Sequence, residues 1–188
     1  MFKKDILLFD LEMTGLDVTK HEIIQIAAIL LDRKTLKEKK SFSTFVKPQR
    51  WAKRDPEAMA VNKISAEDLK NAPSMATALK KFNKTFGSDV TPAMYGGNLD
   101  IVFFPAAYRS VKMKYPFTLQ YTFNLWPLCY FYMAKHKKLT NPKKFAGFTL
   151  EDVGTALGVK KIENRHNAIV DCQYEAEIFR ALVKKLKV

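Results

Sequence analysis

Cysteine is nearly absent from the sequence: the 188 residues contain two, Cys129 and Cys172, which lie far apart. Two distant cysteines form neither a disulfide framework nor a metal-ligand spacing, so we expect a reducing, intracellular setting. Glycine and proline are also scarce, at 7 and 8 residues, while 47% of the chain is hydrophobic. This balance excludes collagen-like and low-complexity chains and predicts a folded core.

Long hydrophobic runs are missing as well. The longest apolar runs are residues 26–31 and 125–134, and the second contains Pro127. Both are far shorter than the roughly 18 residues that cross a bilayer, so we expect no transmembrane helix and no membrane partner. Asp10 interrupts the first apolar stretch before it reaches the length of a signal-peptide core. We therefore expect a cytoplasmic protein.

Acidic residues are too few to balance the basic ones. Lys and Arg number 32 against 19 Asp and Glu, which gives a formal net charge of +13. Such an excess attracts polyanions, so nucleic acid is the leading class of partner. Lysine enrichment for solubility alone would give the same excess, and charge by itself does not decide between the two explanations.

The chain has no internal repeat and no linker rich in Gly, Ser or Pro, so we expect one domain that spans residues 1–188. Apolar and β-branched residues then predict strands in the first half and one short strand later. These predicted strands are residues 6–11, 23–31, 40–46 and 93–95.

Helical signals dominate from Pro56 onward. Ser74 is placed to cap a helix that ends near residue 86, and Thr149 opens another short helix. Residues 101–111 and 166–186 carry apolar side chains at helical spacing, most strongly in the last segment. Strands followed by helices interleaved with short strands predict an α/β fold, in which helices pack on a sheet.

Asp10 and Glu12 are the first residues that point to chemistry. They lie two apart on a predicted strand, so both side chains project from one face, about 6 to 7 Å apart along the backbone. Burying unpaired carboxylates costs several kcal/mol, and a divalent metal ion is the natural compensating charge. An isolated pair of this kind is usually a solvated strand edge. Here it follows the apolar run 6–9 and precedes a Thr14–Gly15 turn, which is where α/β folds hold their sites.

Three further candidates lie at predicted helix openings. His166 precedes Asp171 by five residues at the start of the last helix. An imidazole titrates at about pH 6.5, so His166 is suited to accept a proton from water as a general base. Taken singly, a helix-capping histidine and a solvated aspartate explain these two residues. Asp100 opens the helix near residue 101, where an acid stabilises the helix dipole by about 0.3 to 1 kcal/mol without any further role.

Three short stretches together resemble the exonuclease motifs of the DEDDh family of 3′-to-5′ exonucleases, in the family's order and over nearly the whole chain. The stretches are residues 9–16 (FDLEMTGL), Asp100 with Phe103 and Phe104, and Arg165–His166 with Asp171. The family includes the proofreading subunit of bacterial DNA polymerase III, ribonuclease T and oligoribonuclease. The first motif is most similar to oligoribonuclease, whereas residues 148–158 and the last helix are more similar to the proofreading branch.

The resemblance implies a ribonuclease H-like fold, with a mixed central β-sheet flanked by helices, and a metal site. Carried over residue by residue, it implies that two divalent ions, Mg²⁺ or Mn²⁺, are held by four acids, with His166 as the general base. Oxygen ligands suit these hard cations better than zinc. The four acids are Asp10, Glu12, Asp100 and Asp171.

The resemblance also implies that Met13, Thr14 and Leu16 contact the terminal nucleotide. A sister branch of the family has a tyrosine four residues before its last aspartate, where this chain has Asn167. This difference favours the histidine branch.

The second motif departs from the family pattern. Many relatives place a His-Asn pair four or more residues before the aspartate, whereas Asn98 precedes Asp100 by two residues. We therefore do not expect Asn98 to contact substrate. Asp89 is the alternative acid, although it precedes the predicted strand.

Residues and resemblance together predict a metal-dependent 3′-to-5′ exonuclease that hydrolyses single-stranded DNA or RNA from 3′ ends and releases 5′-mononucleotides. Paired ions about 3.5 to 4 Å apart suit this chemistry. One alternative keeps the chemistry but acts on short RNA, as an exoribonuclease or oligoribonuclease. A different alternative is an inactive basic module that only binds nucleic acid. The sequence leaves open the choice of DNA or RNA, and whether the partner is a second copy or a polymerase.

Overall fold

The strands of the computed structural model form one mixed sheet in the order β3-β2-β1-β4-β5. Neighbours β1, β2 and β3 pair antiparallel, whereas β4 runs parallel to β1 and β5 runs parallel to β4. The strands are β1 (Ile6–Met13), β2 (Ile23–Leu31), β3 (Glu38–Phe45), β4 (Thr91–Met94) and β5 (Phe123–Asn124). The structure describes residues 2–96, 99–140, 148–163 and 166–186.

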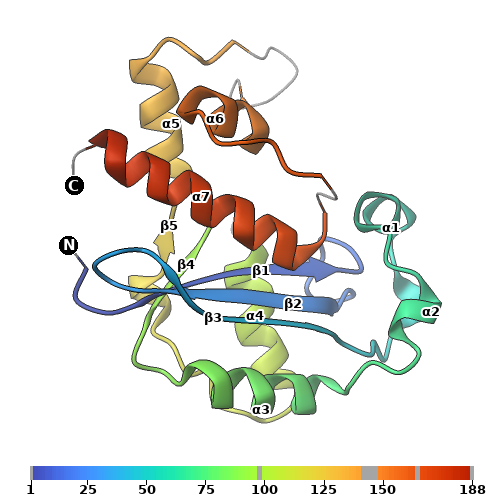
Figure 1. Ribbon diagram of the computed structural model, residues 1–188. Coiled ribbons are helices and arrows are strands. Elements are labelled where there is room, and N and C mark those ends of the chain that lie inside the picture. Colours follow the sequence, from blue (N-terminus) through green and yellow to red (C-terminus); the bar gives the residue numbers. More distant parts are fainter. Residues whose placement is uncertain (1, 97–98, 141–147, 164–165, 187–188) are drawn as a thin grey trace.

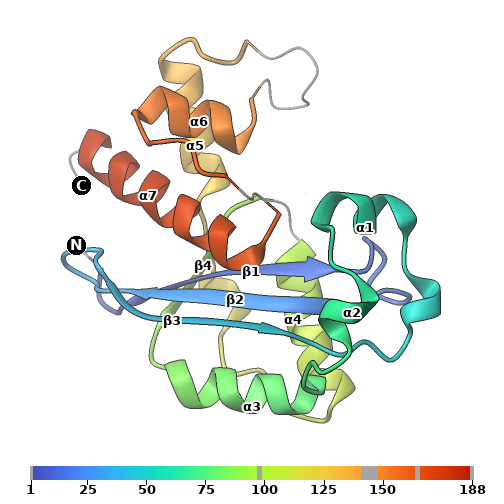
Figure 2. The same ribbon diagram turned by 45° about the vertical axis from the view of Figure 1, so that its right-hand side comes forward.

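Helices cover both faces of the sheet, as the family resemblance implies. The long helix α7 lies across one face, and α3 and α4 lie on the opposite face (Figures 1 and 2). All nine residues of β2 are buried between these layers. The helices are α1 (Pro56–Asn62), α2 (Ala66–Leu69), α3 (Met75–Phe86), α4 (Leu99–Ser110), α5 (Trp126–Lys135), α6 (Leu150–Leu157) and α7 (Ala168–Leu186).

The core divides along the two faces of β1. Leu7 and Phe9 pack with Phe104 of α4 and its neighbours, whereas Leu8 packs with Cys172 and other residues of α7. Side chains alternate between faces along a strand, so the odd-numbered residues of β1 face α3 and α4 and the even-numbered ones face α7. The polar residues 10 and 12 that follow Leu8 therefore belong to the α7 face.

The predicted helices form with small shifts in their ends. Ser74 accepts a hydrogen bond from the Thr77 backbone and caps α3, which ends at Phe86 as predicted. Thr149 forms a capping box at the start of α6. The last helix begins at residue 168 rather than at the predicted 166. No helix within the described ranges is long and apolar enough to cross a membrane.

Beyond the sheet, α5 and α6 pack against α7 (Figure 1). No helix is predicted from the sequence for Trp126–Lys135, although Pro127 lies in the first turn of α5, where proline is tolerated. Cys129 of α5 and Cys172 of α7 are both buried free thiols. The buried side chains shared by α5, α6 and α7 extend the core along α7 past the edge of the sheet.

Candidate active site

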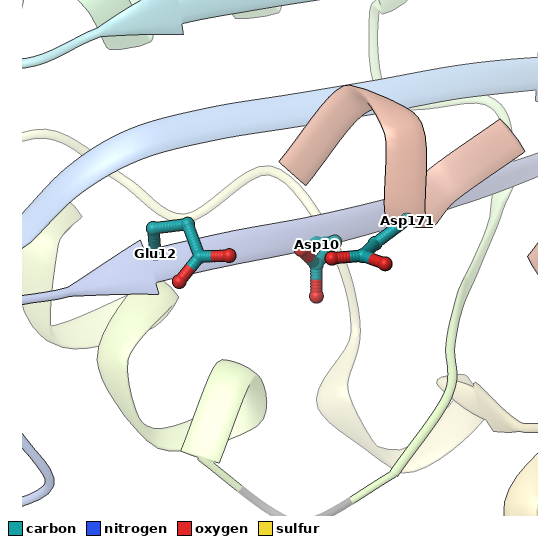
Figure 3. A group of neighbouring side chains, drawn as sticks. All are labelled: Asp10, Glu12 and Asp171. Carbon is teal, nitrogen blue, oxygen red and sulfur yellow. The ribbon is translucent and has the colours of Figure 1, made fainter. Parts of the chain in front are cut away.

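Three carboxylates from opposite ends of the sequence meet at the carboxyl end of β1. Asp10 and Glu12 project from the α7 face of the strand, and Asp171 projects toward them from α7 (Figure 3). One carboxylate oxygen from each residue lies within 4.8 Å of the other two. An all-oxygen donor set of this kind fits hard divalent cations such as Mg²⁺ and Mn²⁺.

The first turn of α7 is tied to the sheet through a buried glutamine. Gln25 lies opposite Glu12 in the register of β1 and β2, and only 3% of its surface is exposed. Its Oε1 accepts a hydrogen bond from the Ala168 backbone N–H at 3.1 Å, and its Nε2 donates to Asn167 Oδ1 at 3.5 Å. Gln25 thereby fixes the helix start that presents Asp171 to the acids of β1.

Asp100 lines the same cavity from α4. Strands β1 and β4 are parallel, so their carboxyl ends share one edge of the sheet, and α4 begins shortly after β4. Asp100 lies in the first turn of α4, is buried, and lines a cavity of about 270 Å³ with Asp10, Glu12, His166 and Asp171. It is not one of the three acids that lie within 4.8 Å of one another.

The acids of the cavity oppose one another's ionisation in the metal-free protein. The pKa of Asp10 is raised well above its ordinary value, first by burial and then by the charges of Asp100, Glu175, Glu12 and Asp171. Cations bound among these carboxylates would relieve this repulsion.

Burial also raises the pKa of Asp100, to about 7, and hydrogen bonds from the backbone of Leu11 and of Asp100 itself only partly offset it. The alternative acid, Asp89, lies outside the cavity lining. It is exposed and forms an ion pair with Lys4 at 2.9 Å.

His166 lies at the mouth of the cavity. It is exposed and sits two residues before α7 with a left-handed backbone, at φ 66°. Its backbone N–H donates a hydrogen bond to Asp171 Oδ2 at 2.8 Å. The histidine and the aspartate are thus held together, while the imidazole stays open to solvent. Arg165, its neighbour in the motif, and Asn98 lie outside the described residues.

The three predicted substrate contacts have different surroundings. Met13 lines the cavity, and Leu16 is 66% exposed on the following turn. Thr14, by contrast, is 1% exposed, and its Oγ1 accepts a hydrogen bond from the Glu22 backbone N–H at 3.0 Å. Asn62 of α1 donates to the Met13 carbonyl at 3.1 Å. Leu16 therefore faces outward, and Met13 borders the cavity while it packs against the core on the α4 side. The Thr14 side chain braces the loop.

The turn after β1 has room only for glycine. A Cβ added at Gly15 would overlap the imidazole of His21. That ring is held in place because the Asp17 backbone N–H donates to His21 Nδ1 at 3.0 Å. Close packing of this ring against the backbone fixes the loop that carries Met13 and Leu16.

Two buried polar residues near the cavity escaped the sequence analysis. Glu175 lines the cavity and is 3% exposed, one helical turn beyond Asp171. Its spacing of four residues from Asp171, on the apolar side of an amphipathic helix, is the signal that could have identified it. For Gln25, the signal is a single amide within the otherwise apolar strand β2.

Comparison with known proteins identifies the family. A family model described as Exonuclease (RNase_T) matches residues 7–179. The chain therefore belongs to this exonuclease family, which confirms the resemblance. The chain is 26% identical over 186 residues to a protein named DNA polymerase III PolC-type from Caldanaerobacter subterraneus subsp. tengcongensis. That match covers 97% of this chain but 12% of the polymerase.

Solved nuclease structures share the fold. Cell-death related nuclease 4 (CRN-4) superimposes with a TM-score of 0.78 and 17% identity, over 97% of this chain and 64% of that one. The nuclease domain of 3′hExo, a DEDDh family member bound to rAMP, gives a TM-score of 0.70 and 18% identity. This match covers 97% of this chain and 92% of the 3′hExo domain. The predicted ribonuclease H-like fold is thereby confirmed.

Proposed function

We propose that residues 1–188 form one exonuclease domain that hydrolyses single-stranded nucleic acid from its 3′ end and releases 5′-mononucleotides. The observation that carries this proposal is the convergence of Asp10, Glu12 and Asp171, whose oxygens lie within 4.8 Å of one another. Membership of the exonuclease family supports the same activity. The net charge of +13 favours binding of a polyanionic strand.

Four carboxylates would hold two divalent ions, Mg²⁺ or Mn²⁺. Asp10, Glu12 and Asp171 form the tight cluster, and Asp100 lines the same cavity from the first turn of α4. When bound, such ions supply activation of a water molecule and neutralise the charge that develops on the leaving 3′-oxygen. Within the described part of the cavity lining, Glu175 is the only further acid.

His166 would accept a proton from the attacking water. Its place at the cavity mouth suits this role, since the ring is exposed to solvent while its backbone is bonded to Asp171. Met13 and Leu16 would contact the terminal nucleotide from the turn after β1. Thr14 would act through the shape of that turn, because its side chain is buried within it.

The test uses 5′-labelled single-stranded DNA and RNA of graded lengths, incubated with Mg²⁺ or with EDTA. We expect Mg²⁺-dependent shortening by one nucleotide per step. In Asp171→Asn the cleavage rate should fall by more than about 100-fold, because a metal ligand is removed. The control Asp89→Asn removes an exposed acid outside the cavity and should leave the rate unchanged.

The products also separate the alternatives. Shortening confined to short RNA would assign the protein as an oligoribonuclease rather than a general exonuclease. Strand binding without metal-dependent shortening of either polymer would instead support an inactive binding module. Association with a polymerase or with a second copy stays a prediction. Co-purification would check the first, and a measurement of the oligomeric state would check the second. The relative named DNA polymerase III PolC-type motivates the first of these.

A further inference from the structure

Glu175 is an acid in the interior of α7 that the family's motif residues do not include. Its side chain is 3% exposed, on a helix whose neighbouring buried residues are Cys172, Tyr174 and Ala176. Burying a carboxylate costs several kcal/mol unless the surroundings compensate for it. A charged residue in such a position therefore needs a physical explanation.

The position of Glu175 relates it to the metal site rather than to the outer packing of α7. It follows Asp171 by four residues, so the two acids lie on one face of the helix, one turn apart. Both line the cavity of about 270 Å³ that also contains the acids of β1. Glu175 is not one of the three acids of the tight cluster, Asp10, Glu12 and Asp171.

The charges around the cavity are of one sign. Five carboxylates line it, and within the described part of the lining there is no Lys or Arg. Glu175 shares this cavity lining with all three acids of the tight cluster. Its charge therefore acts on the place where a cation would bind.

We propose that Glu175 is a positioning residue of the metal centre, a fifth carboxylate that acts through Asp171, one helical turn away, and strengthens the binding of divalent cations. The inference rests on the proposed function, since it assumes that the cluster binds metal. An additional negative charge in a poorly solvated cavity attracts a doubly charged ion more strongly than it would in water. Outer carboxylates of this kind orient the ligands and raise affinity.

The same charge has an opposite effect on the metal-free protein. Without cations, Glu175 adds to the repulsion among the acids and destabilises the folded state. Removing its charge while keeping its shape should therefore weaken cation binding and stabilise the metal-free fold together. A glutamate that serves only to fill space or to bond its neighbours would not produce this pair of opposite effects.

The experiment measures Mn²⁺ affinity by titration calorimetry, and thermal unfolding in EDTA, for the wild type and three variants. For Glu175→Gln we expect a Kd for Mn²⁺ that rises roughly 10- to 100-fold, with a Tm in EDTA that rises by about 2–4 °C. Glu175→Asp keeps the charge and should recover most of the affinity. The control Glu177→Gln changes a mostly exposed acid of the same helix, which pairs with Arg180, and should alter neither quantity.

Each result has a defined meaning. An unchanged Kd in Glu175→Gln, or a fall in its Tm in EDTA, overturns the inference and assigns Glu175 a structural role. If Glu175→Gln does not fold, Glu175→Asp decides. If Glu175→Asp folds and its Mn²⁺ affinity falls no further than that of the control Glu177→Gln, the negative charge at position 175 is supported as the property that matters. A wild type that binds no Mn²⁺ overturns the proposed function together with this inference, whereas binding equal in wild type and Glu175→Gln overturns this inference alone.

Discussion

Asp100 couples the stability of the metal-free protein to pH. Burial raises its pKa to about 7, from an ordinary value of 3.8. The folded protein therefore holds this proton more tightly than the unfolded chain. The stabilisation is fully present below the unfolded pKa and is lost as the pH rises through the folded pKa.

We expect this loss to appear as a difference between wild type and Asp100→Asn. Between about pH 5 and pH 8 in EDTA, the wild type should lose on the order of 2 kcal/mol of unfolding free energy relative to the variant. Urea unfolding at a series of pH values measures it. The comparison cancels the pH dependence of the charges that lie outside the cavity. Parallel profiles would show that Asp100 ionises normally.

His166 should matter for the rate and not for binding. His166→Ala removes the proton acceptor at the cavity mouth, so we expect cleavage to slow by about 10²- to 10⁴-fold. Affinity for a single strand, measured by fluorescence anisotropy in EDTA, should stay the same. His136→Ala, which alters an exposed histidine directly after α5, is the matched control. A parallel loss of binding would contradict the assignment and indicate a structural role.

Single residues of the site could be predicted when a local pattern exposed them. Asp10 and Glu12 share a face because residues two apart on a strand always do, and the apolar run before them identified the strand. The burial of the Thr14 hydroxyl could not be foreseen, since its partner is the Glu22 backbone across a turn. Glu175 was missed because its contact with the cavity depends on where α7 docks.

The helices that frame the cavity are positioned by a few close contacts. Gly154 of α6 lies against the Tyr174 side chain of α7, and a Cβ at Gly154 would overlap the tyrosine hydroxyl. Both residues are buried in the cluster that α5 and α6 form with α7. The two helices can therefore pack this closely because Gly154 has no side chain.

Gly154→Ala should destabilise the fold, contrary to the usual effect of alanine in a helix. Alanine normally stabilises a helix by roughly 1 kcal/mol relative to glycine. Here the overlap with Tyr174 should cost more, and we expect a net loss of about 1–3 kcal/mol in urea unfolding. Thr155→Ala, at an exposed position of the same helix, is the control. A more stable Gly154→Ala would contradict the packing described for α6 and α7.

Helices and strands with strong local signals were predicted well, and those without were not. The cap at Ser74 and the end at Phe86 both match α3. Helix α5 escaped because it is apolar on most sides and carries Pro127, which reads as a break in a sequence pattern. Strand β5 is only two residues long, too short for any periodicity.

The order of the strands brings the site together, and sequence periodicity alone could not supply it. Asp10 and Asp171 meet because α7 crosses β1 and β2, and Asp100 joins them because β4 is parallel to β1. Only the family resemblance predicted that these segments converge. Local patterns report which face a residue occupies, but not which distant segment covers that face.

The excess of positive charge should make strand binding sensitive to salt. With a net charge of +13, contacts to about three phosphates would give a slope near −2 in a plot of log affinity against log salt. Affinity should then fall roughly tenfold or more between about 50 and 200 mM salt. Anisotropy with a labelled single strand in EDTA measures it. An affinity independent of salt would show that the lysines do not contact the backbone.

The most direct measurement is the anomalous X-ray signal of Mn²⁺ in crystals of the protein soaked with Mn²⁺ and a 5′-mononucleotide. We predict two ions about 3.5 to 4 Å apart, with the nucleotide phosphate beside them. The four carboxylates that hold the ions are those of Asp10, Glu12, Asp100 and Asp171. Crystals in which the cavity stays free of Mn²⁺, or in which the ions bind elsewhere, would contradict it.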